Sequence, residues 1–289
     1  MELRRTLLFI PGNNPGMLQN AGILGADSVI LDLEDAVAPR EKDAARLLVC
    51  HALKTTDFGS CEKVVRINPI DTSAQEDVAA IVPCRPDALL VPKVNSAADI
   101  HQVVRWLEAS EKSNQQPVKI IALIETPLGI VNCYSIAAAH PRVVAVALGA
   151  EDYTAGLGTS RTKDGQEIFT ARTILVNAAA AAGIQAIDTP FTDVLDEDGL
   201  AADIAFAKKM GFKGKLVINP RQVDAIHEGF SPSAAEIEWA QRVVAIIKKA
   251  EEQGAGAISL DGKMIDKPIV DRAERLLQLA QALGLEGRR

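Results

Sequence analysis

The sequence predicts a (β/α)8 TIM barrel, of the α/β class, with a C-terminal helical extension. Eight short, almost continuously apolar runs recur along the chain, as expected of parallel strands covered on both faces. Longer amphipathic stretches separate them, and 289 residues suffice for such a barrel. A doubly wound open sheet is the alternative, but it usually has fewer strands and often a glycine-rich phosphate turn, and the sequence contains no GxGxxG or Walker pattern.

The predicted strands alternate with predicted helices. The strands cover residues 6–10, 28–33, 63–67, 88–92, 119–124, 142–148, 184–188 and 215–219. Start and stop signals mark several helices, such as the N-cap Ser96 and the terminating Gly183 and Gly211. The helices cover residues 39–53, about 96–117, 127–140, 169–183 and 196–211.

Residues 230–289 exceed what a barrel needs. They contain a predicted helix from Pro232 to about Gly254, a short segment over 257–268 and a last helix that ends near Leu283. No Ser/Gly-rich linker separates this tail from the barrel at 1–229. We therefore treat 230–289 as an extension of the same structural domain, which could pack on a neighbouring subunit.

Composition excludes several classes of partner. The net charge of −7 argues against nucleic acid and against an anionic membrane surface. No apolar run approaches the ~18 residues that a membrane span requires. The apolar run at the N-terminus ends at Pro11, so we interpret it as the first strand and not as a secretory signal. The sequence thus predicts a cytoplasmic protein.

Polar side chains follow nearly every predicted strand. In a TIM barrel the carboxyl ends of the strands form one rim, where the chemistry is placed. The exits carry Asn13, Asp32 with Glu34, Arg66 with Asn68, Lys93, Glu125, Asp152, Asp188, and Asn219 with Arg221. The alternative for each residue is a solvated loop position, but in a barrel all of these side chains would converge on the same rim. The sequence therefore predicts a polar pocket at the rim.

Two of these acids suit one metal ion. Glu125 ends the fifth predicted strand and Asp152 follows the sixth, so their carboxylates can approach each other. Two carboxylates completed by water and substrate oxygens are an ordinary Mg²⁺ arrangement. The four histidines fall in helix-like stretches, which argues against zinc. The alternative is a rim ion pair of these acids with Arg66 or Lys93.

Arg66 lies within an otherwise apolar strand. Near the rim its guanidinium could clamp a carboxylate or a thioester oxygen in a bidentate manner. An ion pair with Asp32 or Glu34 is the alternative, and both roles could hold at once. The backbone N–H groups of the small-residue segment Gly149, Ala150 and Glu151 could cradle a substrate carboxylate.

The ordered motifs TLLFIPGNN, VILDLEDAV with PREKDAAR, VVRIN, VPK, IETPLGI, LGAEDY and LVINPRQV resemble the citrate lyase beta-subunit family. That family also holds malyl-CoA and citramalyl-CoA lyases. The resemblance runs from about Arg4 to Asp266. The DLEDAV and SLDGKMIDKPIVDRA phrases are closer to the citrate lyase beta subunit than to its CoA-dependent relatives.

The resemblance implies a TIM-barrel lyase that assembles as a homo-oligomer and cleaves a citryl thioester into oxaloacetate and an acetyl thioester. It assigns Mg²⁺ to Glu125 and Asp152, and substrate to Arg66. Asp266 matches an acid that closes over a neighbouring subunit's site in the CoA lyases. Asp32, Glu34 and Asp266 are the candidates for proton transfer. The implied partners are an acyl carrier protein, or CoA, and citrate lyase alpha and gamma subunits.

Three other functions compete with this one. A citramalyl-CoA or malyl-CoA lyase would use the same site. A Schiff-base aldolase would use Lys93, since a desolvated lysine can become a nucleophile. A non-catalytic barrel could dock a carrier protein on Arg161, Lys163 and Arg221, although these are equally explained as solvated charges.

Overall fold

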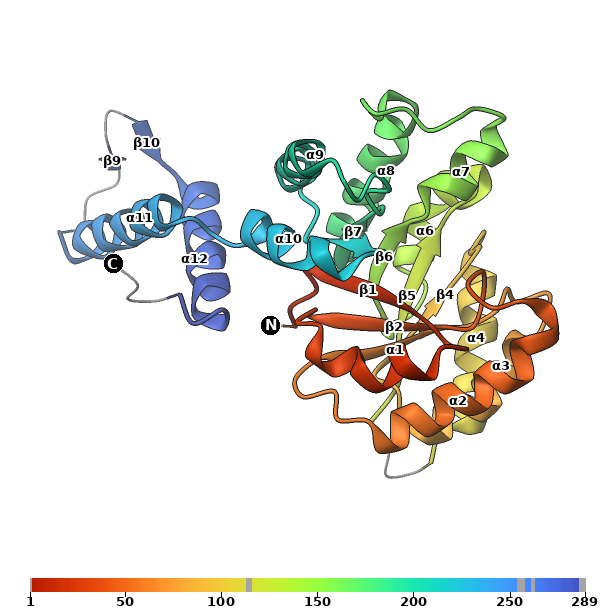
Figure 1. Ribbon diagram of the computed structural model, residues 1–289. Helices are drawn as coiled ribbons and strands as arrows, with labels where there is room; N and C mark the ends of the chain where they lie inside the picture. Colours follow the sequence, from red (N-terminus) through yellow and green to blue (C-terminus); the bar gives the residue numbers. More distant parts are fainter. Residues whose placement is uncertain (1, 113–115, 254–257, 261–262, 286–289) are drawn as a thin grey trace. The chain divides into compact units, whose positions relative to one another are not determined.

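The computed structural model describes residues 2–112, 116–253, 258–260 and 263–285. Eight parallel strands form a closed barrel in chain order, β1 to β8, which confirms the predicted fold class (Figure 1). Each strand lies within two residues of its predicted bounds. The strands are Thr6–Pro11, Ser28–Asp32, Glu62–Arg66, Ala88–Val91, Lys119–Ile124, Val143–Leu148, Gln185–Asp188 and Gly214–Val217.

The barrel interior is filled by apolar side chains from alternate strand positions. Ile30, Val64 and Leu123 belong to this buried cluster. Because side chains alternate along a strand, the residues two positions further on, at the carboxyl ends, face the same interior. These residues are Asp32, Arg66 and the position of Glu125 just after β5. The pleat therefore directs three charged side chains toward one another above the core.

The opposite end of the barrel is closed by a second polar group. Arg4 donates to both carboxylate oxygens of Glu62, at 2.7 and 2.5 Å, and to Gln185 Oε1 at 2.9 Å. Ser28 Oγ also donates to Glu62, at 2.8 Å. These contacts tie the amino ends of β2, β3 and β7 together and seal the interior on that side.

Helices surround the barrel (Figure 1). They are α1 Pro15–Asn20, α2 Lys42–Thr55, α3 Ala74–Ile81, α4 Ala97–Ser110, α5 Pro127–Val131, α6 Cys133–Ala137, α7 Ala150–Leu157, α8 Gln166–Ala182, α9 Glu197–Met210 and α10 Val223–Phe230. The predicted caps hold: Ser96 forms a capping box with Asp99, and Gly183 and Gly211 end α8 and α9 in the left-handed conformation.

The structure corrects several helix predictions. The helix expected over 127–140 is broken at Asn132, whose side-chain amide donates to the Asn95 carbonyl at 2.8 Å. The helix expected to reach residue 117 ends at Ser110. Four short helices, α1, α3, α7 and α10, were not predicted, because each has eight residues or fewer, which is shorter than the window over which helical periodicity is recognised.

Between β7, β8 and the helices α8 and α9 lies a buried ionic group that we call the outer quartet, formed by Arg172, Asp188, Asp203 and Lys215. Arg172 binds both oxygens of Asp188, at 2.9 and 2.8 Å, and also Asp203. Lys215 Nζ lies 2.6 Å from Asp188 and 2.6 Å from Asp203. Asp188 and Lys215 are fully buried. Asp188 was expected at the rim pocket, but its neighbour Ile187 faces the interior, so Asp188 faces the helices instead.

The chain divides into two compact units, one over Arg4–His227 and the other from Glu228 onward together with the first residues, up to Leu3. The assignment of 230–289 to the same structural domain as 1–229 stays a prediction. In the second unit, α11 Ala234–Gln253 packs against α12 Lys267–Ala282, with the hairpin β9 Ile258–Leu260 and β10 Lys263–Ile265 beside them. Its core comprises Ala240, Val243, Leu260, Ile265 and Ala273. The packing of this tail on a neighbouring subunit stays a prediction.

Candidate active site

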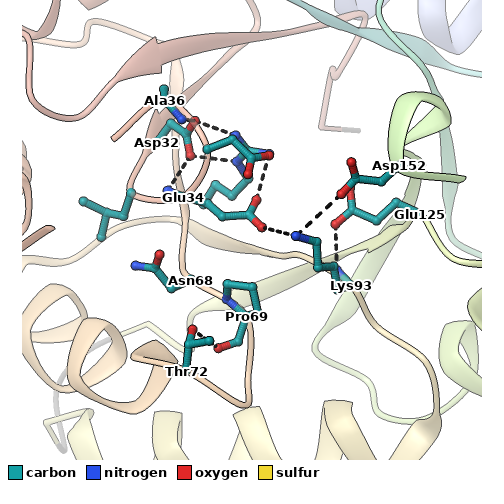
Figure 2. A network of polar contacts seen from close by, with 12 residues as sticks. Asp32, Glu34, Ala36, Asn68, Pro69, Thr72, Lys93, Glu125 and Asp152 are labelled. Carbon is teal, nitrogen blue, oxygen red and sulfur yellow. Dashed lines mark hydrogen bonds and ion pairs between the residues drawn. The ribbon is translucent and has the colours of Figure 1, made fainter. Parts of the chain in front are cut away.

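The carboxyl ends of the strands carry a charged group that we call the rim cluster: Asp32, Glu34, Asp35, Arg66, Lys93, Glu125 and Asp152. They come from the ends of β2, β3, β4 and β5 and from the first turn of α7. Figure 2 shows most of them facing one another across the rim. Residues that lie far apart in the sequence thus meet in one place, as the strand exits predicted.

Arg66 is anchored by Asp32. Its Nε and Nη2 donate to the two Asp32 oxygens at 2.7 and 2.5 Å, a bidentate pair. Asp32 in turn accepts the backbone N–H groups of Glu34, at 2.8 Å, and Ala36, at 3.3 Å. The guanidinium also lies 4.8 Å from the centre of the Phe9 ring. These contacts fix the plane of Arg66 and leave Nη1 directed at the remaining acids.

Glu34 is buried between two cations. One oxygen lies 2.9 Å from Arg66 Nη1 and the other 3.2 Å from Lys93 Nζ, but neither makes an aligned hydrogen bond with a described residue. Burial raises the pKa of Glu34, and the positive charges of Arg66 and Lys93 only partly oppose this. Glu34 is therefore a buried carboxyl group that is harder to ionise than one in water.

Burial and neighbouring charges also raise the pKa of Glu125. It is 5% exposed, and burial together with the charges of Glu34 and Asp152 raises its pKa to about 8. Its Oε1 accepts the backbone N–H of Lys93 at 2.8 Å. Gly149 leaves space for the other oxygen, since a Cβ there would come within 2.5 Å of Oε2. A buried carboxylate held on one side and costly to ionise suits a cation ligand.

Asp152 completes the pair. It lies in the first turn of α7, its side chain is 46% exposed, and its Oδ2 is 3.5 Å from Lys93 Nζ. Its charge contributes to the raised pKa of Glu125, and Figure 2 draws the two carboxylates next to each other. Within the part of the chain described, no three His, Cys, Asp or Glu side chains form a metal cage. A cation here would use two carboxylates and draw its other ligands from water and substrate.

Charge counting supports a cation site. Arg66 and Lys93 face five carboxylates in the rim cluster. Even with Lys42, whose ammonium donates to the carbonyls of Leu33 and Glu34 at 2.7 and 2.5 Å, acids outnumber cations. Sequence reasoning missed Lys42 as a brace of this loop. The alternation of charges in PREKDAAR gave no signal that its amine would turn back toward β2.

Other predicted site residues behave differently. The N–H of Gly149 donates to the Ile124 carbonyl at 3.0 Å, and that of Ala150 to Thr189 Oγ1 at 3.3 Å. Two of the three amides proposed to cradle a carboxylate are thus already used within the protein; Glu151, exposed in α7, keeps that role as a prediction. Asp266 lies in the tail unit, where it is exposed and caps α12 by accepting the N–H of Ile269 at 3.3 Å.

The basic residues considered for docking are partly paired. Lys163 Nζ lies 2.6 Å from Asp196, and Arg161 Nε lies 3.2 Å from Glu167. Arg221 is exposed at the exit of β8. Two of the three charges are therefore balanced locally, which weakens the prediction of a basic docking patch.

Fold and rim together define a TIM-barrel protein with an acid-rich charged cluster at the carboxyl ends of its strands, braced by one arginine. The chain belongs to the HpcH/HpaI aldolase/citrate lyase family, whose model matches residues 5–220. It is 46% identical to the citrate lyase subunit beta of Leuconostoc mesenteroides subsp. cremoris, over 97% of this chain and 94% of that protein. Identity to the mitochondrial citramalyl-CoA lyase of Mus musculus is 35%, over 97% and 87%.

A solved structure also matches this chain over nearly its whole length. The CitE protein of Mycobacterium tuberculosis, in complex with magnesium, acetoacetate and coenzyme A, matches with a TM-score of 0.79 at 34% identity. The match covers 96% of this chain and 98% of that one. None of the helices described here is long and apolar enough to cross a membrane.

Proposed function

We propose that the protein is a Mg²⁺-dependent carbon–carbon lyase that cleaves a citryl thioester into oxaloacetate and an acetyl thioester. The observation that carries the proposal is the meeting of Glu125, Asp152 and Arg66 in one acid-rich pocket. The similarity to citrate lyase beta subunits supports the substrate, and the magnesium in the Mycobacterium tuberculosis complex supports the metal.

Glu125 and Asp152 would hold the ion. Both are hard oxygen donors, and the surplus of carboxylates over cations around them fits a divalent charge. When bound, Mg²⁺ would acidify the substrate hydroxyl and stabilise the ketone that replaces it. The raised pKa of Glu125 means that binding the ion must also displace the proton that this carboxyl group otherwise retains.

The protein side chains would carry the rest of the cleavage. The bond between the hydroxyl-bearing carbon and the methylene next to the thioester breaks. A base accepts the hydroxyl proton, the O–H electron pair forms the C=O bond of the ketone, and the electron pair of the broken C–C bond passes to the acetyl thioester as its enolate. Arg66, held by Asp32, would stabilise the negative charge on the enolate oxygen of the acetyl thioester. Protonation of the enolate carbon then releases the acetyl thioester.

Glu34 is the better placed of the barrel's two candidates for proton transfer. Both Asp32 oxygens are engaged by the bidentate contact with Arg66, whereas both Glu34 oxygens lack an aligned hydrogen bond with a described residue. Burial raises the pKa of Glu34, which favours a role as a proton donor. Asp266 remains the candidate from the tail.

An acyl carrier protein is the proposed carrier of the thioester, with citrate lyase alpha and gamma subunits as partners in a homo-oligomeric assembly. A stand-alone citramalyl-CoA or malyl-CoA lyase is the second candidate, supported by the 35% identity to citramalyl-CoA lyase. A Schiff-base role for Lys93 is disfavoured. Burial alone would lower the pKa of this amine, but the charges of Glu34 and Asp152 raise it, which keeps the group protonated and not nucleophilic.

The decisive experiment is a cleavage assay with citryl-carrier, citryl-CoA, malyl-CoA and citramalyl-CoA, each with Mg²⁺ and with EDTA. Glu125→Gln is expected to reduce turnover of the preferred substrate by about 10²–10³-fold, since metal stabilisation of the transition state is worth several kcal/mol. Glu108→Gln, the same change on the exposed face of α4, is the control. Unchanged turnover in Glu125→Gln, or cleavage that survives EDTA, would refute the proposal.

A further inference from the structure

Lys93 adopts a backbone conformation that lysine rarely uses. Its φ is +53°, in the left-handed region, at the exit of β4. Such strain is maintained where the surroundings fix it and often marks a functional position. In this conformation the Lys93 N–H reaches Glu125 Oε1 at 2.8 Å, so the residue contacts one proposed metal ligand through its backbone.

The neighbouring loops fix this conformation. Asn95 Nδ2 donates to the Lys93 carbonyl at 3.1 Å, and Asn95 Oδ1 accepts from Thr126 Oγ1. Thr126 follows Glu125 directly and also caps α5 through the Gly129 N–H. The exits of β4 and β5 are thereby tied together, and the Lys93 side chain is directed across the pocket (Figure 2).

The ammonium group contacts the second proposed ligand. Lys93 Nζ lies 3.5 Å from Asp152 Oδ2 and 3.2 Å from Glu34 Oε1. The residue thus touches Glu125 through its amide and Asp152 through its side chain. A divalent cation on those two carboxylates would have a like charge beside it, and the repulsion would weaken its binding by about tenfold.

An anionic ligand would reverse this effect. A hydroxy-acid or oxo-acid that contributes oxygens to the metal also brings a further carboxylate into the pocket. Arg66 is buried and engaged by Asp32, Glu34 and Asp35. The Lys93 side chain is 39% exposed, and its ion pairs with Glu34 and Asp152 are 3.2 and 3.5 Å long. Lys93 is therefore the cation positioned to receive that carboxylate.

We infer that Lys93 couples the binding of the metal to the binding of the carboxylate substrate. Before either binds, its ammonium neutralises Asp152 and Glu34 and disfavours a metal ion alone. Once a carboxylate ligand enters, the ammonium pairs with it and the penalty on the metal disappears. Such a device is a positive coupling between two sites and must act equally in both directions. The inference rests on the proposed function, because it assumes the metal at Glu125 and Asp152.

Titration calorimetry of Mg²⁺ binding, with and without oxaloacetate at 0.15 M salt, tests the coupling. Lys93→Met is expected to bind Mg²⁺ alone about tenfold more tightly than the unmodified protein, since it lacks the competing charge. The enhancement of Mg²⁺ affinity by oxaloacetate is expected to shrink by about tenfold. Lys93→Arg, which keeps the charge, should restore most of the coupling, which a purely structural role would not predict.

Lys63→Met is the matched control, because Lys63 lies at the start of β3 and pairs loosely with Asp87 at 3.7 Å. It removes the same charge at the other end of the barrel, and screening by salt should leave Mg²⁺ affinity unchanged. Equal or weaker Mg²⁺ binding by a folded Lys93→Met protein would overturn the inference. Loss of Mg²⁺ binding is expected in Glu125→Gln, and its persistence there would instead refute the proposed metal site.

Discussion

The barrel holds two ionic groups of similar composition and opposite character. The outer quartet has two cations and two carboxylates, and each cation binds both acids. The rim cluster has two cations against five carboxylates, and both oxygens of Glu34 lack an aligned hydrogen bond with a described residue. One group is closed and balanced, and the other is open and acidic.

The difference shows what separates a structural ionic group from a binding site in this fold. Burying charges is tolerated when each is paired and hydrogen-bonded, as in the outer quartet. In the rim cluster burial, together with neighbouring acids, raises the pKa values of Glu34 and Glu125, and such perturbation is typical of functional sites. The surplus of acids over cations in the rim cluster is the feature on which the proposed cation site rests.

The largest expected effect comes from breaking the balanced group. Lys215→Met would leave Asp188 and Asp203 to share Arg172, with Asp188 fully buried. Removing one partner from a buried ion pair costs about 3–5 kcal/mol of unfolding free energy. Urea unfolding followed by circular dichroism measures that loss.

The matched change in the rim cluster is Glu34→Gln. It removes a carboxyl group whose pKa is already raised by burial, so we expect it to cost less than about 1 kcal/mol. Equal losses in Lys215→Met and Glu34→Gln would contradict the distinction between the two groups.

Strand positions were predictable because continuous apolar runs are the direct consequence of burial on both faces. Whether the residue at each strand end faces the barrel interior or the helices was harder to predict from the sequence. Asp188 and Glu125 both follow apolar runs, yet only Glu125 continues the inward phase set by Leu123, while Asp188 follows the inward Ile187. A strict count of alternation from the barrel interior would have separated them, but it requires the strand register to be known first.

The proposed metal pair and the arginine also followed from strand order, since adjacent strands bring their exits together. The conformation of Lys93 could not be predicted from strand order. Its left-handed backbone and the Asn95 contact that fixes it depend on two loops meeting in space. The hydrogen-bond partners of the Gly149 and Ala150 amides were not predictable for a similar reason, because Ile124 and Thr189 come from other strand ends.

Gly149→Ala sharpens the comparison by disturbing the geometry of the rim cluster while leaving its charges intact. The new Cβ would lie 2.5 Å from Glu125 Oε2 and 2.6 Å from Glu125 Cβ, so Glu125 must shift. We expect Mg²⁺ affinity to fall at least about tenfold and stability by about 1–3 kcal/mol from overpacking. Calorimetry and thermal unfolding measure the two effects.

Gly16→Ala is the control for that change. A Cβ at Gly16 would meet Asn14 at 3.5 Å, an ordinary contact, in helix α1. Mg²⁺ affinity should be unaffected there. If both alanine variants bound Mg²⁺ like the unmodified protein, the close fit of Gly149 to Glu125 would have no role in the site.

A further effect is expected on the pH dependence of the metal-free protein. The pKa of Glu125 is raised from 4.5 to about 8, so between these values the folded state holds a proton that the unfolded state has lost. Stability from this group is therefore complete below about pH 4.5 and is lost as pH rises through about 8. Glu125→Gln removes the titration and should exceed the unmodified protein by roughly 1–2 kcal/mol at pH 8.5 in EDTA.

Glu111→Gln is expected to change the pH dependence of stability in the opposite direction. Burial would raise the pKa of Glu111, but hydrogen bonds from Arg142 and from the Val118 N–H lower it below its usual range. This group stabilises the fold above its unfolded pKa and loses that contribution in acid, so Glu111→Gln should be less stable than the unmodified protein at pH 7 and approach it as pH falls. Urea unfolding from pH 4.5 to 8.5 measures both variants. If the unfolding free energies of Glu125→Gln and the unmodified protein changed in parallel with pH, the pKa of Glu125 would not be raised in the folded protein. The physical argument for a cation beside this carboxyl group would then be lost.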